Sequence, residues 1–218
     1  ILLRAYNSVL IESNLVERGD SWGVNCTATR YLWEGPAPQN MTIRNNRFNH
    51  VPSAYGYRPE EVWDMDAILV GEDADGSPMT QTMGYVHITG NVFSNSLVHD
   101  VSVLNCYNVN ISSNISYSAQ PQPVGVGQYG QILNSSIYVA ACSNVVLQGN
   151  QLVNPSPSCP NVVKVGPYVT GLAGSDVAAA VTLTNNPSPG WPTGVNASFT
   201  KATVQLTSPL QTAQAIYN

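Results

Sequence analysis

Charge is what this chain has least of: Asp, Glu, Lys and Arg make up only 10% of its 218 residues, and the formal net charge is −5. Its eight Lys and Arg residues form no basic stripe that could follow a phosphate backbone, so nucleic acid is not expected as a partner. No apolar run approaches the roughly 18 residues of a membrane-spanning helix, so no membrane span is expected.

Motifs for cofactor binding are also missing. The sequence has no zinc-ligand spacing, phosphate-binding loop or nucleophile elbow, so neither a metal nor another cofactor is predicted. Gly125-x-Gly127-x-x-Gly130 imitates a dinucleotide fingerprint, but it lies in a Pro- and Gln-rich stretch with no helix after it. A signal peptide is absent as well, and strand-like residues begin at Ile1 without a preceding cap, which leads us to expect polypeptide upstream of Ile1.

A repeat dominates what is present. The pattern apolar-x-apolar-x-x-Asn occurs six times, and its Asn residues are Asn14, Asn46, Asn91, Asn114, Asn150 and Asn186. Recurrence at such intervals is typical of a solenoid, and apolar residues at i and i+2 predict strands with one buried face. The Asn after each strand suits a turn, where its amide can bond the backbone. The sequence therefore predicts an all-β fold, a right-handed parallel β-helix of about six coils over residues 1–190. A terminal strand or cap is expected over residues 191–218.

A second strand repeats with the first, at residues 1–3, 24–26, 68–70, 101–103 and 137–139. Coils two and three have insertions at one corner, within residues 27–40 and 72–85. Irregular corners on a regular stack are typical of a functional edge, because loops vary while the core stays fixed. They are equally typical of loops that only shield strand edges from other chains.

N-glycosylation sequons are frequent. Six N-x-Ser/Thr sites together with low charge favour a secreted glycoprotein. The repeat Asn residues are expected to form an internal ladder when the coils stack, and a buried amide cannot accept a glycan, so Asn114 is excluded as an acceptor. Asn110 should point outward from the same strand. The predicted glycosylation sites are Asn25, Asn40, Asn110, Asn134 and Asn196.

Two of the four cysteines occupy one corner position on successive coils, Cys106 and Cys142. Stacked strands lie about 4.8 Å apart, within the separation that a disulfide accepts. The pair is therefore a candidate disulfide, with two reduced, stacked thiols as the alternative.

Carboxylates are scarce and unevenly placed. Asp20 and Asp64 each stand four residues before a second strand, so they match on consecutive coils, and Asp66, His99 and Asp100 fall at the same corner. Carboxylates on adjacent and alternate coils would lie about 5 and 10 Å apart, which brackets the separations used by glycosidases. We predict this corner as catalytic, with a solvated edge as the plainer alternative.

A second acidic position and several tryptophans accompany the corners. Glu34 lies at the opposite end of the second strand and is the other catalytic candidate. Trp22, Trp33 and Trp63 are candidate substrate-binding residues, together with His99, because aromatic faces stack on sugar rings. The same tryptophans would also serve as the packing core of their loops.

A family resemblance rests on residues 7–14, on Trp33-Glu34-Gly35-Pro36 and on residues 40–48. These stretches resemble the β-helix of secreted carbohydrate-active proteins and are most similar to the β-helical α-1,3-galactosidase-like glycoside hydrolases. The resemblance covers about residues 1–153 and implies a domain that acts on or binds a polysaccharide or glycan. The family's Gly-Asp-Ala-Asn is replaced here by Cys26-Thr-Ala-Thr-Arg30. The alternative function is that of a non-catalytic structural or adhesive module. Such a module would assemble with copies of itself or contact the polypeptide upstream of Ile1.

Overall fold

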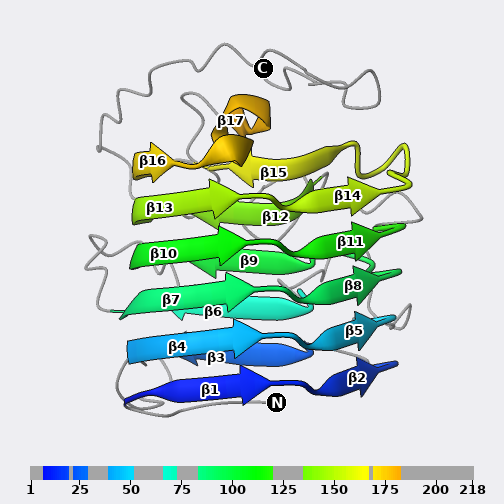
Figure 1. Ribbon diagram of the computed structural model, residues 1–218, viewed down its shortest axis with the longest axis horizontal. Coiled ribbons are helices and arrows are strands. Elements are labelled where there is room, and N and C mark those ends of the chain that lie inside the picture. The colour runs from blue at the N-terminus through cyan, green and yellow to red at the C-terminus, as the bar shows by residue number, and fades with distance from the viewer. Residues whose placement is uncertain are drawn as a thin grey trace.

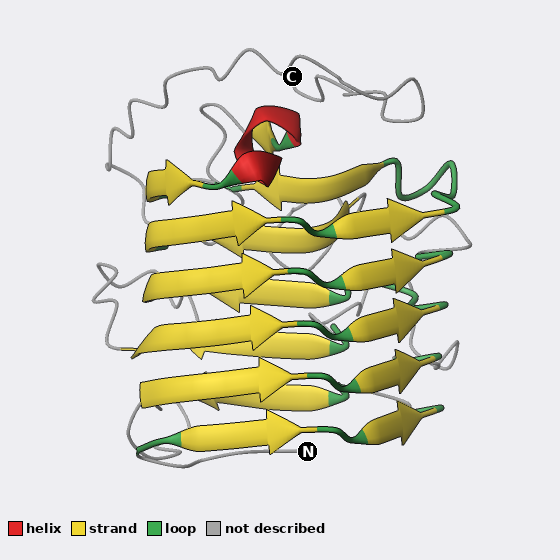
Figure 2. Cartoon of the chain, in the orientation of Figure 1, coloured by secondary structure: helices red, strands yellow, loops and turns green. Residues whose placement is uncertain are grey.

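The computed structural model describes residues 7–19, 22–28, 39–51, 66–72, 83–119, 135–166 and 169–182. These residues form three parallel sheets in which each strand pairs with its counterpart in the next coil (Figure 1). Two sheets lie side by side at the front of the view and the third lies behind them. The predicted parallel β-helix is confirmed, and Figure 2 shows that strands dominate the described part of the chain.

The ladder sheet carries the repeat found in the sequence. Its strands are β1 (Val9–Glu12), β4 (Gln39–Arg44), β7 (Met83–Thr89), β10 (Cys106–Ser112), β13 (Ser143–Gln148) and β16 (Thr170–Ala173). The second apolar residues of the repeat stack as one inward row, formed by Ile11, Ile43, Ile88, Ile111 and Leu147. Residues between the inward positions face out, as Leu10 does with 59% exposure. The predicted alternation of faces is confirmed.

The covered sheet contains the second predicted strand. It consists of β3 (Val24–Ala28), β6 (Ile68–Glu72), β9 (Val101–Leu104), β12 (Ser135–Ala140), β15 (Asn161–Val165) and β17 (Val181–Thr182). Unlike the ladder sheet it is buried on both faces. Inward residues such as Val101 join the main core, whereas Leu69, Leu104 and Tyr138 belong to a separate apolar cluster.

The groove sheet was not predicted. Its strands are β2 (Leu15–Glu17), β5 (Arg47–Asn49), β8 (Val92–Ser94), β11 (Ile115–Tyr117) and β14 (Gln151–Val153). Phe48 and Phe93 stack inside it with ring centroids 5.1 Å apart. A signal for this sheet exists, because an apolar residue stands two places after four of the five described repeat Asn residues: Val16, Phe48, Phe93 and Leu152.

A ladder of Asn side chains joins the ladder sheet to the groove sheet. Asn46 Oδ1 accepts hydrogen bonds from the backbone N–H and from Nδ2 of Asn14, at 2.9 and 3.0 Å. The same arrangement recurs between Asn46 and Asn91, Asn91 and Asn114, and Asn114 and Asn150. Asn114 is 3% exposed, as expected of a ladder residue.

The sixth copy of the repeat does not form a sixth rung. Val181, its first residue, pairs with Lys164 in the covered sheet, and Asn186 lies outside the described residues. A short 3-10 helix, η2 (Ser175–Ala179), occupies the place of the next corner and ends the ladder with Asp176. The prediction therefore assigned this strand to the wrong sheet, because the spacing of its apolar residues does not specify which sheet a strand joins.

Candidate functional site

The predicted acidic corner exists. Ala67 N–H donates to His99 O at 3.1 Å, which places Asp66 beside His99 on adjacent coils. Asp66 Oδ1 lies 3.1 Å from His99 Nδ1, and Ser102 Oγ lies 3.2 Å from the same nitrogen. The His99 ring also stacks on Tyr138, with centroids 5.3 Å apart. Register alone thus brought these residues together as expected.

The corner is closed rather than open or solvated at Asp66, His99 and Asp100, because all three are at most 1% exposed. Asp100 turns toward the core, where its Oδ2 accepts hydrogen bonds from Ser116 at 2.5 Å and Ser136 at 2.6 Å. Burial raises the pKa of Asp100, although these hydrogen bonds act in the opposite direction. Asp66 and Asp100 therefore serve separate buried networks.

Lys164 adds a buried cation to the covered sheet. It is 1% exposed, and burial lowers its pKa to about 7. Lys164 is the register partner of Tyr138 on the neighbouring strand β12, and Tyr138 is the register partner of Ser102 on β9. A buried row of Ser, Tyr and Lys is thus continuous with the Asp66–His99 pair.

The remaining catalytic and substrate-binding candidates fall into two groups. Trp22 is 36% exposed and lies just before β3, at the corner that contains Asp66. The others lie outside the described residues and stay predictions: Asp20, Trp33, Glu34, Trp63 and Asp64.

Cys106 and Cys142 occupy equivalent corners, but neither forms a disulfide, so the predicted bridge is wrong in this structure. Cys142 Sγ instead accepts a hydrogen bond from the backbone N–H of Cys106 at 3.4 Å. Cys106 Sγ donates to Leu104 O at 3.2 Å and Cys142 Sγ to Ala140 O at 3.1 Å. The alternative of reduced, stacked thiols describes the pair.

The described sequons differ in exposure. Asn25 is 7% exposed, and its Oδ1 accepts a hydrogen bond from the Thr27 hydroxyl at 2.8 Å. Asn40 is exposed, and Asn110 is half-buried between inward Val109 and Ile111. Asn134 and Asn196 lie outside the described residues.

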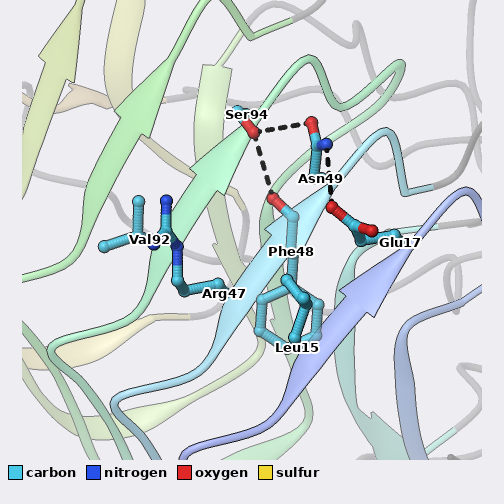
Figure 3. Close-up of a pocket in the computed structure, with 7 residues that line it drawn as sticks. All are labelled: Leu15, Glu17, Arg47, Phe48, Asn49, Val92 and Ser94. Carbon is cyan, nitrogen blue, oxygen red and sulfur yellow. Dashed lines mark hydrogen bonds between the residues drawn. The ribbon is translucent and has the colours of Figure 1, made fainter.

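An open groove lies instead on the outer face of the groove sheet. It has a volume of about 340 Å³ and is lined by Leu15, Glu17, Arg47, Phe48, Asn49, Val92 and Ser94 (Figure 3). Strands β2, β5 and β8 each contribute the first and third of their three residues, because alternate side chains face the same way. Phe48, 1% exposed, belongs to the core beneath.

Two rows of side chains run across the groove. Glu17, Asn49 and Ser94 are register partners in the polar row, where Ser94 Oγ donates to Asn49 Oδ1 at 2.9 Å. Asn49 Nδ2 donates to Glu17 Oε1 at 3.4 Å, so hydrogen bonds hold the whole row (Figure 3). Leu15, Arg47 and Val92 form the parallel row, which combines apolar surface with one guanidinium.

The groove presents hydrogen-bond acceptors, hydrogen-bond donors and apolar patches, but few charges. Glu17 is its single carboxylate and Arg47 its single cation among the described lining residues. Within the described part of the chain no three His, Cys, Asp or Glu side chains could share a metal ion. None of its described helices has the length and apolar character needed to cross a membrane.

Comparison with known proteins gives one result. The model of the family described as "Right handed beta helix region" matches residues 1–186, whereas no curated protein and no solved structure matches the chain. The match extends over all of the described coils.

Proposed function

The chain belongs to the right-handed β-helix family, a fold that fits carbohydrate-binding or carbohydrate-acting modules in general, and from this premise we propose that it is a secreted carbohydrate-binding domain. Its binding site in this proposal is the groove across β2, β5 and β8. The observation that carries the proposal is the polar row of Glu17, Asn49 and Ser94, held by hydrogen bonds beside a partly apolar row.

Sugar chemistry suits this arrangement. Each sugar hydroxyl both donates and accepts hydrogen bonds, whereas the C–H faces of the ring are apolar. Glu17 accepts, Arg47 donates, and Asn49 does both. A chain of sugars that crosses the strands would meet one polar side chain in each coil, because adjacent strands repeat the row about every 4.8 Å.

Binding without cleavage is the activity proposed for this groove. Hydrolysis of a glycosidic bond ordinarily uses a pair of carboxyl groups about 5 to 10 Å apart, and the described lining supplies only Glu17. Glycoside hydrolysis remains a separate prediction for Asp20, Asp64 and Glu34, which lie outside the described residues. The resemblance to the galactosidase-like family supports that prediction. A saccharide-binding groove that does not cleave also suits an adhesive module of a cell wall or extracellular matrix.

The proposal is tested with Asn49→Ala, which removes the centre of the polar row. Binding would be measured on a broad glycan array and then by calorimetry with the best ligand. We expect affinity to fall at least about tenfold, equivalent to about 1.4 kcal/mol, because Asn49 also positions Glu17 and Ser94.

Gln151→Ala is the matched control. Gln151 is exposed on β14 and continues the outward row of Arg47 and Val92 beyond the groove, so this variant should bind as the wild type does. The proposal fails if the wild-type domain binds no saccharide, or if both variants lose affinity equally. Product analysis on the same ligands detects any cleavage.

A further inference from the structure

One residue per coil has a left-handed backbone directly before the first inward residue of its ladder-sheet strand, as Tyr85 does before Val86. This column consists of Ser8 (φ 52°), Asn40 (φ 51°), Tyr85 (φ 56°), Asn108 (φ 52°), Asn144 (φ 52°) and Gly171 (φ 65°). Its members are equivalent, because the residues that flank them pair in register from coil to coil. The column is therefore a left-handed backbone position that every described coil shares.

Tyr85 does not suit this column. Left-handed φ is tolerated by Gly and Asn, which occupy four of the other positions, but it is strained for a bulky aromatic residue. Burial does not offset the strain, since Tyr85 is 47% exposed. A strained, exposed aromatic side chain points to a role outside the packing of the fold.

Neighbouring residues hold Tyr85 from one side. Its ring meets the ring of Tyr107 nearly edge-on, with centroids 5.4 Å apart and an interplanar angle of 74°. Tyr107 O–H donates to Gln39 Oε1 at 2.9 Å, and its ring lies where a Cβ on Gly84 would collide with it. The Tyr85 ring is therefore set on a fixed support made of uncharged side chains.

Asn40 is the neighbour of Tyr85 on the next strand. Gln39 pairs with Gly84 and Met41 with Val86, so Asn40 and Tyr85 hold the same position on β4 and β7. Both are exposed, and adjacent strands lie about 4.8 Å apart. Asn40 also begins the sequon Asn40-Met41-Thr42. An exposed aromatic ring thus stands directly beside an exposed acceptor for an N-linked sugar.

We propose that Asn40 carries an N-linked glycan whose first sugar, N-acetylglucosamine, stacks on Tyr85. The apolar C–H face of the pyranose ring covers the exposed ring of Tyr85, and this contact offsets the backbone strain. In the modification, Asn40 Nδ2 bonds to the anomeric carbon of a lipid-linked oligosaccharide. The bond from that carbon to the diphosphate breaks, the lipid diphosphate leaves, and Nδ2 loses one proton. The proposal rests on the secretion assumed for the proposed function but not on its groove.

A double-mutant cycle tests the contact in protein secreted from eukaryotic cells. Thr42→Val removes the sequon and keeps a β-branched residue in β4, whereas Tyr85→Asn restores the residue type of the column. Glycopeptide mapping should find Asn40 occupied in the wild type. Without the glycan, Tyr85→Asn should raise the melting temperature, because strain is relieved; with the glycan, it should lower it, because the stack is lost. Tyr85→Phe keeps the ring and should match the wild type.

Three outcomes would overturn the proposal. Asn40 could be bare in the secreted protein, or Tyr85→Asn could shift the melting temperature equally with and without the glycan, which would show no coupling. The third is loss of binding to a free saccharide on Tyr85→Asn in the Thr42→Val background, which would assign the ring to an external ligand. Binding in the groove of β2, β5 and β8 is measured separately with Asn49→Ala, so failure of one proposal is distinguishable from failure of the other.

Discussion

Asp100 shows how a single residue can be placed correctly by register and still have an unexpected environment. Its carboxyl group is fully buried and receives two serine hydroxyls, and burial raises its pKa. A carboxyl whose pKa is higher in the folded state holds its proton more tightly there than in the unfolded chain. The stability it contributes is thus complete below the unfolded pKa and is lost as pH rises through the folded pKa.

Asp100→Asn should remove this pH dependence, because an amide has no proton to lose in that range. As pH rises from about 3 toward neutrality, the wild type should lose unfolding free energy relative to the variant, because only the wild type must ionise a buried carboxyl group. Urea unfolding at a series of pH values measures this. A difference that stays constant over the range would contradict the buried, titrating carboxyl.

Individual strands are stabilised by the inward rows. Ile88 in β7 is fully buried between Ile43 and Ile111, whereas its neighbour His87 is exposed on the same strand. Ile88→Ala should lower the unfolding free energy by about 2–5 kcal/mol, through lost burial and a cavity. His87→Ala is the matched control and should change it by less than about 0.5 kcal/mol. Denaturant titration of the two variants gives the comparison, and similar losses would mean that the faces of β7 are reversed.

The described molecule is a stack of coils, and the carboxylate of Asp176 accepts the hydrogen bonds at the C-terminal end of its Asn ladder. Asp176 accepts hydrogen bonds from Gly149 N–H at 2.8 Å, from Asn150 N–H at 2.9 Å and from Asn150 Nδ2 at 2.7 Å. It takes the place that the next Asn would hold in the ladder. Because each coil contacts only its neighbours, damage at this end should stay local.

Asp176→Ala should therefore open the last coils and leave the first ones unchanged. Loss of the acceptor leaves the partly buried backbone N–H of Asn150 without this partner and removes one of the hydrogen bonds of its Nδ2, at a cost of about 1–3 kcal/mol. Hydrogen exchange measured by mass spectrometry should show faster exchange in peptides from β13 and β14 and no change in β4. Faster exchange by the same factor in every coil would show that the stack unfolds as one unit.

The sequence by itself determined the repeat and the features that the repeat imposes. Ile43, Ile88 and Ile111 recur at strand spacing before an Asn, so the inward row, the Asn ladder and four strands of the covered sheet, β3, β6, β9 and β12, could be predicted from periodicity. Nearest-neighbour stacking makes this possible, since equivalent positions in successive coils must meet.

Only the tertiary structure decided which surfaces are open. Asp100 faces Ser116 from another sheet and His99 lies against Tyr138 from the next coil, so their burial depends on packing that no spacing encodes. The groove sheet was missed because its strands are three residues long and Ser116 interrupts its inward apolar row. The left-handed backbone of Tyr85 is likewise a property of a strand position that all described coils share, and a tyrosine gives no sign of it in sequence.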